Sequence, residues 1–380
     1  MKFTCKKDKL KKAINKIERI VSKQITLPIL SNILIKTGKG QLVLVATNLE
    51  IAIKVFVSAK IEKEGELTIP PRIMSGFLSN IKDEVVEGDL VNKELYLKSE
   101  NHSVKIKTLD AKDFPIIPEA PDFYYFNLKT DEVIKAISGV NISLARKDTR
   151  QELNGIFLNF SKEYLTLVST DSFRLTEVKV LINKKSINND YLNFLEVNKG
   201  VIIPGGLISE LQQLPTGSDL NIFLDENQIF LNTNNTQITA QLINGQYPDY
   251  KQIIPNEFDY EITVDKDELL EAIKITSLVI SEANGEIEIS KQRDDKFLTL
   301  RAKSADLGES TSKVKLQKND NNQFKLYFNY RYLLEGLNSN LFNTQFIKIK
   351  FKENSPVLFR ALVDKKEDQT FLYLVMPITK

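Results

Sequence analysis

The stretch DKLKKAI, residues 8–14, decides the fold, because the same pattern returns twice along the chain. It reappears as DEVIKAI at residues 131–137 and as DELLEAI at residues 267–273, with apolar side chains at the same positions. The copies lie roughly 125 to 135 residues apart, so each repeat is large enough to hold its own hydrophobic core, unlike a solenoid unit. We therefore predict three similar domains in tandem.

Three further features follow each copy in the same order. An alternating strand ends in a polar corner, a second strand runs into a helix, and a hairpin-like pair closes the repeat. In the three repeats these features occupy residues 42–47, 67–70 and 95–115, then 165–170, 201–204 and 229–248, and finally 298–303, 326–329 and 357–377. Pro-containing stretches at 116–122 and 254–258 separate the repeats, which predicts domains at 1–123, 124–258 and 259–380.

Each repeat is predicted to contain two amphipathic helices. In the first, apolar residues at i, i+3, i+4, i+7 and i+11 form one stripe: Leu10, Ala13, Ile14, Ile17 and Val21. The second follows the pair of prolines at 70–71, since proline suits a first helical turn. The strands between the helices show the period of two that one buried face requires. The fold class is therefore α+β, with two helices packed on antiparallel sheets in each domain.

Composition limits the function classes. Of the 380 residues, 42% are hydrophobic and 27% are charged, as in ordinary globular proteins. No apolar run approaches the roughly 20 residues that span a bilayer, and the start lacks a signal-peptide apolar region, so we expect a cytoplasmic protein with no membrane partner. Cys5 and His102 are the only residues of their types, which argues against a disulfide, a zinc cluster and a histidine-based catalytic dyad.

No arrangement of residues predicts catalysis. The chain has no glycine-rich phosphate loop, no Gly-x-Ser-x-Gly turn and no metal-ligand spacing. Acidic pairs such as Asp83-Glu84 and Asp294-Asp295 lie in polar turns, where solvation explains them better than acid–base chemistry. We expect no catalytic residue, no metal and no cofactor, and a hydrolase with paired carboxylates stays a weak alternative.

Basic charge gathers on the first helix. The net charge is only +2, below the basic balance typical of many nucleic-acid-binding domains. Lys12, Lys16, Arg19 and Lys23 nevertheless recur at i, i+4, i+7 and i+11, which gives a basic stripe roughly opposite the apolar one. The stripe favours contact with phosphates, and a solvated helix face is the alternative.

Seven short motifs occur in an order that resembles the bacterial sliding clamps, the beta subunits of replicative DNA polymerases. They are MKFT at 1–4, TLPIL at 26–30, TL at 108–109 with DFP at 113–115, LNG at 153–155, TD at 170–171 with RL at 174–175, YPDY at 247–250 and VMP at 375–377. The resemblance covers essentially the whole chain. It implies a DNA-clamp fold in each domain and a head-to-tail homodimer whose six domains form a ring, with helices lining the hole.

The resemblance also implies which residues face double-stranded DNA, which such a ring encircles without reading its sequence. The arginine that the family has after Pro204 is replaced by Gly205, so one family contact is missing. Family positions and the basic clusters of the first two repeats together predict a DNA-facing set of Lys12, Lys16, Arg19, Lys23, Gln24, Arg72, Arg146, Lys147, Arg150 and Gln151.

The family binds partner peptides in a pocket between its second and third domains. By matching motifs, its wall here would be Leu153, Thr170, Ser172, Phe173, Arg174, Leu175, Pro248, Gln252, Ile253, Asn329, Tyr332, Pro356, Leu374, Met376, Pro377 and Ile378. Such an apolar cleft suits short linear peptides of the replicative polymerase alpha subunit, the clamp loader, other polymerases and repair proteins. A core role is the alternative for Leu153, Ile253 and Leu374.

The chain departs from the family pattern at this pocket. Phe173 stands where histidine is common, Glu152 where an aromatic residue is common, and Thr379-Lys380 end the chain where Arg-Leu is typical. We predict altered polar selectivity over a retained apolar floor.

The dimer contact is predicted to join Val104 and Ile106 of the first domain to Val279 and Ile280 of the third. A repeat-built scaffold or DNA-binding protein that never closes into a ring is the alternative function. Retention on circular but not on linear DNA would distinguish the two.

Overall fold

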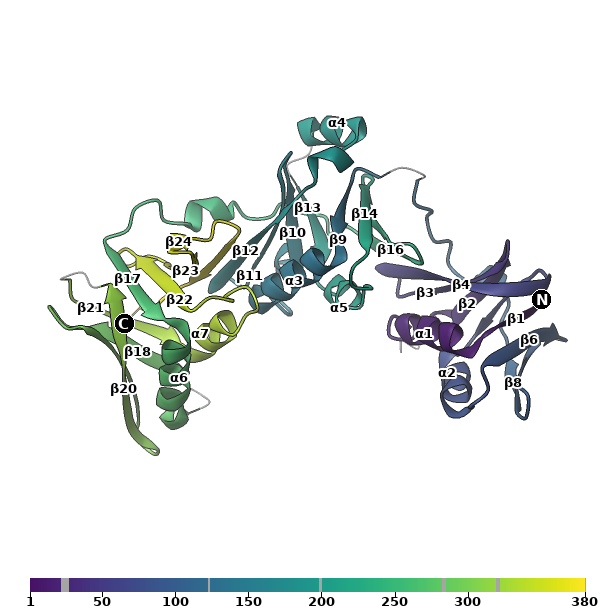
Figure 1. Ribbon diagram of the computed structural model, residues 1–380, viewed down its shortest axis with the longest axis horizontal. Helices are drawn as coiled ribbons and strands as arrows, with labels where there is room; N and C mark the ends of the chain where they lie inside the picture. Colours follow the sequence, from purple (N-terminus) through teal and green to yellow (C-terminus); the bar gives the residue numbers. More distant parts are fainter. Residues whose placement is uncertain (22–26, 122–123, 198–199, 282–284, 319–321, 380) are drawn as a thin grey trace. The chain divides into compact units, whose positions relative to one another are not determined.

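Strands and short helices alternate along the chain (Figure 1). The computed structural model describes residues 1–21, 27–121, 124–197, 200–281, 285–318 and 322–379. The helices are α1 (Lys7–Ile17), α2 (Pro71–Asn80), α3 (Thr130–Val140), α4 (Asn189–Val197), α5 (Leu207–Leu211), α6 (Lys266–Thr276) and α7 (Tyr330–Leu337). The strands are β1 (Lys2–Lys6), β2 (Ile33–Gly38), β3 (Gln41–Thr47), β4 (Ile51–Lys63), β5 (Glu66–Ile69), β6 (Val85–Val91), β7 (Glu94–Lys98), β8 (Ser103–Lys107), β9 (Phe126–Lys129), β10 (Gly155–Phe160), β11 (Tyr164–Thr170), β12 (Arg174–Leu181), β13 (Val201–Pro204), β14 (Asp219–Leu224), β15 (Gln228–Asn232), β16 (Thr236–Gln241), β17 (Tyr260–Asp265), β18 (Glu286–Lys291), β19 (Phe297–Ser304), β20 (Gly308–Lys318), β21 (Phe324–Asn329), β22 (Phe346–Phe351), β23 (Val357–Val363), β24 (Lys366–Glu367) and β25 (Phe371–Val375).

The three copies of the repeated stretch form helices α1, α3 and α6, as predicted, and each helix begins directly after a strand. In α1 the buried residues are Leu10, Ala13, Ile14 and Ile17, and the helix packs on β3, β4 and α2. The helix ends at Ile17, so Val21, which the prediction placed on the apolar stripe, lies beyond the helix. None of the described helices is long and apolar enough to cross a membrane.

Contacts divide the chain into two compact units. The first comprises Met1–Thr130, Lys185–Leu192 and Gln213–Leu242, and the second comprises Asp131–Lys184, Asn193–Gln212 and Ile243–Lys380. The middle repeat is shared, because β9 and β14 to β16 join the sheet of the first unit whereas β10 to β13 join that of the second. The boundaries near residues 123 and 258 stay predictions.

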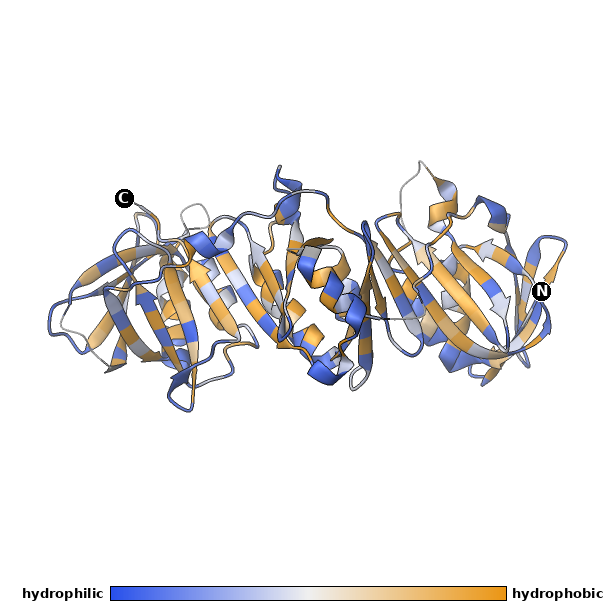
Figure 2. Ribbon diagram, turned by 90° about the horizontal axis from the view of Figure 1, so that it is seen from above, coloured by the Kyte–Doolittle hydropathy of each residue, from blue (hydrophilic) through white to orange (hydrophobic). Residues whose placement is uncertain are grey.

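The first unit is built on one sheet, with antiparallel pairs in the order β8-β7-β6-β1-β4-β16-β15-β14-β9. Strands β2, β3 and β5 join it through β4. One edge of the long strand β4 serves two neighbours: residues 59–63 pair with β1, and residues 51–55 pair with β16. Burial alternates along strands such as β7, and Figure 2 shows the corresponding alternation of hydrophobic and hydrophilic residues.

The second unit is built on a sheet in the order β13-β10-β11-β12-β25-β23-β22-β17-β20-β19-β18-β21, with β24 beside β23. Helix α6 packs against β19, β20 and α7. Strand β12 pairs with β25, whereas β20 meets β17 only near its end, through Leu316 and Lys318. The repeats therefore join through their strands as well as through the chain.

Strand order and register make β4, β12 and β20 equivalent in the three repeats; we call them the receiving strands. The equivalent strands β8, β16 and β25 are the closing strands. β16 pairs with β4, and β25 pairs with β12. Among the described residues, β8 pairs only with β7, and residues 308–312 pair only with β19. One closing strand and one receiving strand thus keep an open edge.

Candidate functional site

Nine of the sixteen predicted peptide-binding residues line one pocket of the second unit, which we call the Phe173 pocket. They are Thr170, Ser172, Phe173, Arg174, Leu175, Ile253, Pro356, Leu374 and Met376. Its volume is about 30 Å³, roughly that of one water molecule. Phe173 is 58% exposed and Met376 is 38% exposed, so these two side chains lie at the solvent side of the pocket.

The turn between β11 and β12 presents Phe173 to solvent. Asp171 Oδ1 accepts hydrogen bonds from the N–H groups of Phe173 and Arg174, both at 3.0 Å. Thr170 Oγ1 donates to the carbonyl oxygen of Arg174 at 2.7 Å. Ser172 has a φ of 75°, a value that L-residues rarely adopt, so the turn holds this strained backbone in place by side-chain hydrogen bonds.

Arg174 ties this turn to α7. Its Nε donates to Asp171 Oδ2 at 2.9 Å, its Nη1 donates to Glu335 Oε2, and its guanidinium carbon lies 4.4 Å from the ring centroid of Tyr332. Burial opposes the charge of Arg174, but the field of Tyr373 and the bonds to Glu335 and Asp171 outweigh burial and raise its pKa. Glu335 was not among the predicted residues, although its position three residues after Tyr332 on one helix was an available signal.

The other predicted pocket residues lie beneath, beside or outside this lining. Leu153 is buried in one cluster with Leu175 and Leu374, which fits the alternative of a core role. Tyr332 borders the pocket, since its ring stacks on Phe173 with centroids 6.4 Å apart. The residues outside the lining are Pro248, Gln252, Asn329, Pro377 and Ile378.

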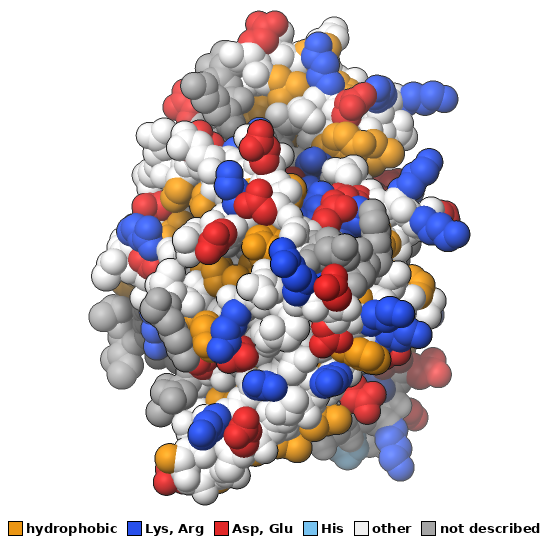
Figure 3. Space-filling model, turned by 90° about the vertical axis from the view of Figure 1, so that its left-hand side faces the viewer, with side chains coloured by type: hydrophobic (Ala, Val, Ile, Leu, Met, Phe, Trp, Pro, Cys, Tyr) orange, Lys and Arg blue, Asp and Glu red, His pale blue; other side chains and the backbone are white. Residues whose placement is uncertain are grey.

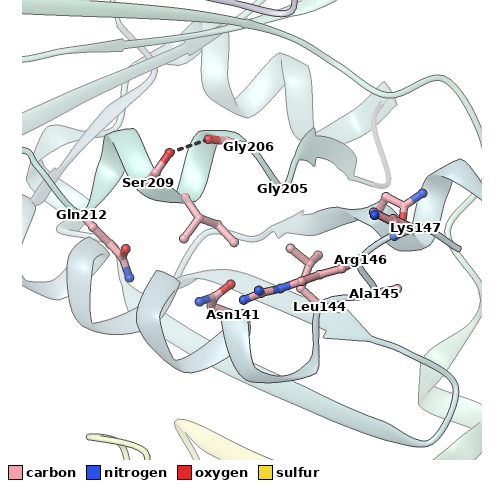
Figure 4. A pocket seen from close by; sticks show the side chains of 11 residues that line it. Asn141, Leu144, Ala145, Arg146, Lys147, Gly205, Gly206, Ser209 and Gln212 are labelled. Carbon is pink, nitrogen blue, oxygen red and sulfur yellow. Dashed lines mark hydrogen bonds between the residues drawn. The ribbon is translucent and has the colours of Figure 1, made fainter. Parts of the chain in front are cut away.

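A second pocket, of about 490 Å³, lies between α3 and α5 (Figure 4). We call it the Arg146 pocket, and its lining residues are Asn141, Leu144, Ala145, Arg146, Lys147, Asn154, Gly205, Gly206, Ile208, Ser209 and Gln212. Figure 4 shows the side chain of Arg146 extending along the pocket toward Asn141. Gln212 Nε2 donates to Ser138 Oγ at 3.1 Å and so ties the residue after α5 to α3. Two predicted DNA-facing residues, Arg146 and Lys147, therefore belong to a cavity.

The remaining DNA-facing predictions differ in their surroundings. The exposed ones are Lys12, Arg19, Arg72 and Gln151, with Arg19 beyond the end of α1. Lys16 is half-buried, its Nζ donates to Thr236 Oγ1 at 3.3 Å, and burial together with Arg19 lowers its pKa. Lys23 and Gln24 lie outside the described residues.

Arg150 has partners within its own unit. Its Nη2 lies 3.2 Å from Asp148 Oδ2 and donates to Ser172 Oγ at 2.7 Å. Arg150 is exposed, so these contacts leave its place in the DNA-facing set a prediction.

Charges of both signs are mixed on the face of the molecule shown in Figure 3. Lys and Arg side chains are interspersed there with Asp and Glu, as a net charge of +2 leads one to expect. Attraction of a polyanion must therefore come from local clusters, such as Arg146 with Lys147.

The residues predicted at the dimer contact are only partly accessible. Val104 is half-buried on the open edge strand β8, but Ile106 is 1% exposed because its side chain faces the core of its own unit. The prediction that the Ile106 side chain lies at a surface contact is therefore corrected. Val279 and Ile280 are half-buried, whereas the neighbouring Leu278, which was not predicted, is 78% exposed.

Comparisons with known proteins agree along the whole chain. Family models of the DNA polymerase III beta subunit match it in three parts: the N-terminal domain at residues 1–118, the central domain at 127–249 and the C-terminal domain at 251–379. The beta sliding clamp of Pseudomonas aeruginosa is 27% identical over 382 residues, covering 100% of both chains. That of Synechococcus elongatus is 26% identical over 388 residues, covering 100% of this chain and 99% of the relative. The crystal structure of the DNA polymerase sliding clamp from Bacillus subtilis superposes with a TM-score of 0.91 at 23% identity, covering 100% of this chain and 99% of that one.

Proposed function

Because the chain belongs to the DNA polymerase III beta subunit family, whose members are sliding clamps and processivity factors, we propose that two copies join head to tail into a ring around duplex DNA. Each copy supplies three tandem clamp domains. The ring acts as a tether for other proteins and carries out no chemistry of its own.

The open edges of β8 and β20 carry this proposal. Twice within the chain, the closing strand of one repeat pairs with the receiving strand of the repeat before it. The remaining closing strand, β8, and the remaining receiving strand, β20, belong to the first and the third repeat. Open strand edges favour pairing with another chain, and a second copy satisfies both of them. Two such head-to-tail contacts close a ring when the rotation between copies permits it.

The register of the internal pairings extends to the contact between copies. Ile238 lies opposite Ile53, and Tyr373 lies opposite Thr176. The equivalent pair between copies is Val104 with Ser310 of the partner subunit.

One residue further along this register, Lys105 comes opposite Glu309 of the partner subunit. An opposite-charge pair across two strands contributes about 0.2 to 1 kcal/mol. The proposed contact thus includes β20, which sequence analysis did not name.

Duplex DNA is proposed to pass through the ring without readout of its sequence. A protein held by many phosphate contacts binds tightly and in a salt-sensitive way, whereas a topological link needs few of them. The net charge of +2 suits the second arrangement. The residues proposed to face DNA are Lys12, Lys16, Arg19, Arg72, Arg146, Lys147, Arg150 and Gln151, and Lys23 and Gln24 remain sequence-based proposals.

Partners are proposed to dock through short linear peptides at the Phe173 pocket. The expected partners are the replicative polymerase alpha subunit, the clamp loader, other polymerases and repair proteins, which implies a cytoplasmic location. Leu175, Leu374 and Met376 offer an aliphatic anchor an apolar floor, and the stacked rings of Phe173 and Tyr332 add an aromatic edge. The pocket residues outside the present lining remain proposals for an opened form.

Retention on circular DNA tests the ring. Dilute protein is mixed with a nicked circular plasmid and concentrated, so that closure of the ring traps the DNA. We expect co-elution with the circle at high salt and release when a restriction enzyme linearises it. Release by salt from intact circles would instead indicate an open scaffold or groove binder and would overturn the ring.

Peptide titration tests the Phe173 pocket. A short peptide with leucine and phenylalanine anchors is titrated by fluorescence anisotropy against the full-length protein and its variants. Met376→Ala is expected to weaken binding by about tenfold, since it removes part of the apolar floor. Leu181→Ala, an exposed position of the same unit, serves as the control. Equal affinities for both variants would contradict the assignment.

A further inference from the structure

The Arg146 pocket is not required by the proposed ring, yet it is large. Its volume of about 490 Å³ falls in the range of small-ligand sites. It lies between α3 and α5, and Figure 4 shows Ser209 on one side and Asn141 with Arg146 on the other.

Two adjacent glycines open this pocket. Pro70 directly after β5, Pro204 at the end of β13 and Asn329 at the end of β21 are equivalent, so Gly206 stands where the first and third repeats carry Arg72 and Arg331. Both arginines occupy the second position of their helices. A glycine at the corresponding place removes a long side chain and leaves that wall of the pocket bare.

Glycine is required at position 205 for a separate, structural reason. Its N–H donates to the carbonyl oxygen of Asn154 at 3.1 Å. A Cβ at this position would lie 2.7 Å from that oxygen and 2.7 Å from Leu144 Cδ2. Only glycine allows this close approach, so the backbone of the turn forms part of the pocket.

The pocket carries positive charge without an acidic residue in its described lining. Arg146 and Lys147 line it, and none of its described lining residues is Asp or Glu. Neither side chain forms an ion pair with any described residue, in contrast to Arg150 on Asp148. Asn154 Oδ1 accepts from the N–H of Lys147 at 3.0 Å and holds its backbone at a φ of 100°. The basic end of the pocket is thus held in place by its surroundings.

The uncharged part of the lining suits the base of a nucleotide. Leu144 and Ile208 offer apolar surface against which a base can pack, and Asn141 and Gln212 bring amide groups to the same cavity. A pocket of equal volume in the third repeat, between α6 and α7, is lined by Lys266, Asp267, Glu271 and Lys274. The acids there offset the bases, so the second repeat alone of these two combines a cavity with unneutralised positive charge.

We propose that the Arg146 pocket binds a nucleoside phosphate, with the phosphate on Arg146 and Lys147 and the base against Leu144 and Ile208. The inference rests on the proposed function only for the source of the ligand, which would be an unpaired nucleotide of the encircled DNA. A free nucleotide has the same chemistry, and the experiment distinguishes the two.

Binding is measured by NMR chemical-shift titration of the full-length protein with three probes: inorganic phosphate, thymidine 5′-monophosphate and a 5′-phosphorylated oligothymidylate of five nucleotides. We expect the oligonucleotide to perturb pocket residues, and to do so more strongly than inorganic phosphate. Binding of the monophosphate as tightly as the oligonucleotide would identify free nucleotide as the ligand. No perturbation by either nucleotide at millimolar concentration would overturn the proposal.

Substitutions distinguish binding inside the cavity from non-specific attraction by positive charge. Arg146→Gln is expected to weaken nucleotide binding about tenfold, as the loss of one charge-assisted contact predicts. Gly206→Arg adds a positive charge but fills the cavity, and its backbone, with φ −59° and ψ −23°, accepts any residue. The pocket predicts weaker binding for this variant, whereas non-specific attraction predicts tighter binding and would refute the proposal. Lys274→Gln, in the pocket of the third repeat, is the control and should leave affinity unchanged.

Two further measurements keep the outcomes distinct. Thermal unfolding verifies that each variant is folded, and retention on circular DNA reports the ring separately. Loss of retention with unchanged nucleotide binding would count against the ring and leave this inference standing.

Discussion

Two glycines in helices differ in whether their surroundings leave space for a methyl group. A Cβ at Gly336, in α7, would lie 2.1 Å from Cε1 of Tyr373. That ring is fully buried and its hydroxyl donates to the carbonyl oxygen of Tyr332 at 2.9 Å, so it has no room to move. A Cβ at Gly76, in α2, would meet no atom within 4 Å. The same residue type thus allows close packing in one helix and only weakens the other.

Alanine substitutions at these two glycines are expected to have opposite effects. Gly336→Ala should lower the free energy of unfolding by about 1 to 3 kcal/mol through overpacking. Gly76→Ala should raise it by about 0.5 to 1 kcal/mol, because alanine is the better helix former. Urea unfolding measures both, and destabilisation of similar size in the two variants would show that the ring of Tyr373 is not the cause.

The single cysteine offers a further test at this scale. Cys5 is 5% exposed, and burial raises the pKa of its thiol to about 12. At pH 8 the thiolate fraction is therefore about one in ten thousand, and reagents that need the thiolate should not label the native protein. We expect modification by a thiol-reactive disulfide reagent only in guanidinium chloride. Rapid labelling of the native protein would contradict the buried position of β1.

At the scale of elements, the first two repeats contain the same type of turn. Thr47 Oγ1 donates to the carbonyl oxygen of Ile51 at 3.0 Å, as Thr170 Oγ1 does to that of Arg174. Leu49 has a φ of 76° where Ser172 has 75°. The polar corner predicted after each alternating strand is thus one defined turn in the first two repeats. In the second repeat this turn places side chains at the Phe173 pocket.

A charge cluster of the third repeat, with two lysines on β22 and a glutamate on β24, leads to a prediction about pH. Glu367 Oε2 lies 2.9 Å from Lys350 Nζ, and Glu367 Oε1 lies 3.0 Å from Lys348 Nζ. Burial acts to raise the pKa of Glu367, but the hydrogen bonds from Lys350 and Lys348 outweigh it, so the pKa is lowered. A carboxylate with a lowered pKa stabilises the fold above its unfolded-state value near 4.5 and loses this contribution as pH falls through the folded-state value.

We therefore expect Glu367→Gln to cost about 1.5 to 3 kcal/mol at pH 7, the range for hydrogen bonds to charged groups. The difference from the unsubstituted protein should shrink when unfolding is measured below pH 4.5. Glu353→Gln, at an exposed turn position, is the control. A difference that stays constant down to pH 3 would show that the cost comes from packing and not from charge.

At the scale of the whole molecule, strand pairing decides how many copies are needed. Two of the three closing strands find a receiving strand within the chain, and β8 does not. Most folds protect an open edge, and here the chain carries two edges of complementary kind in different repeats. Association with a second copy follows from this arrangement more directly than from apolar surface area.

Cysteine cross-linking tests the register of that association, and the buried Cys5 does not interfere. The pair Val104→Cys with Ser310→Cys should oxidise to a covalent dimer, because directly opposed residues in antiparallel strands fall within disulfide range. The pair Lys105→Cys with Ser310→Cys should not, since a shift of one residue turns the side chain to the other face. Dimers that do not extend into longer ladders are expected on denaturing gels. A ladder would instead indicate an open filament.

Much of the fold and part of the candidate site were predictable because their signals are local. The repeat, the buried stripe of α1 and the period of the strands follow from side-chain spacing, which determines the face that an element buries. The residues that line the Phe173 pocket were all among those that the resemblance to the family implied, and the turn at 170–174 that carries several of them is fixed by hydrogen bonds between neighbouring residues.

Only the tertiary structure decided the remaining features. The bond from Arg174 to Glu335 joins residues 161 positions apart, and Ile106 turned out to face its own core. The open edges of β8 and β20 and the Arg146 pocket likewise depend on which strands and helices meet. Contacts between distant elements are set by long-range register and packing. A local sequence pattern does not determine them, because they form only when the chain has folded.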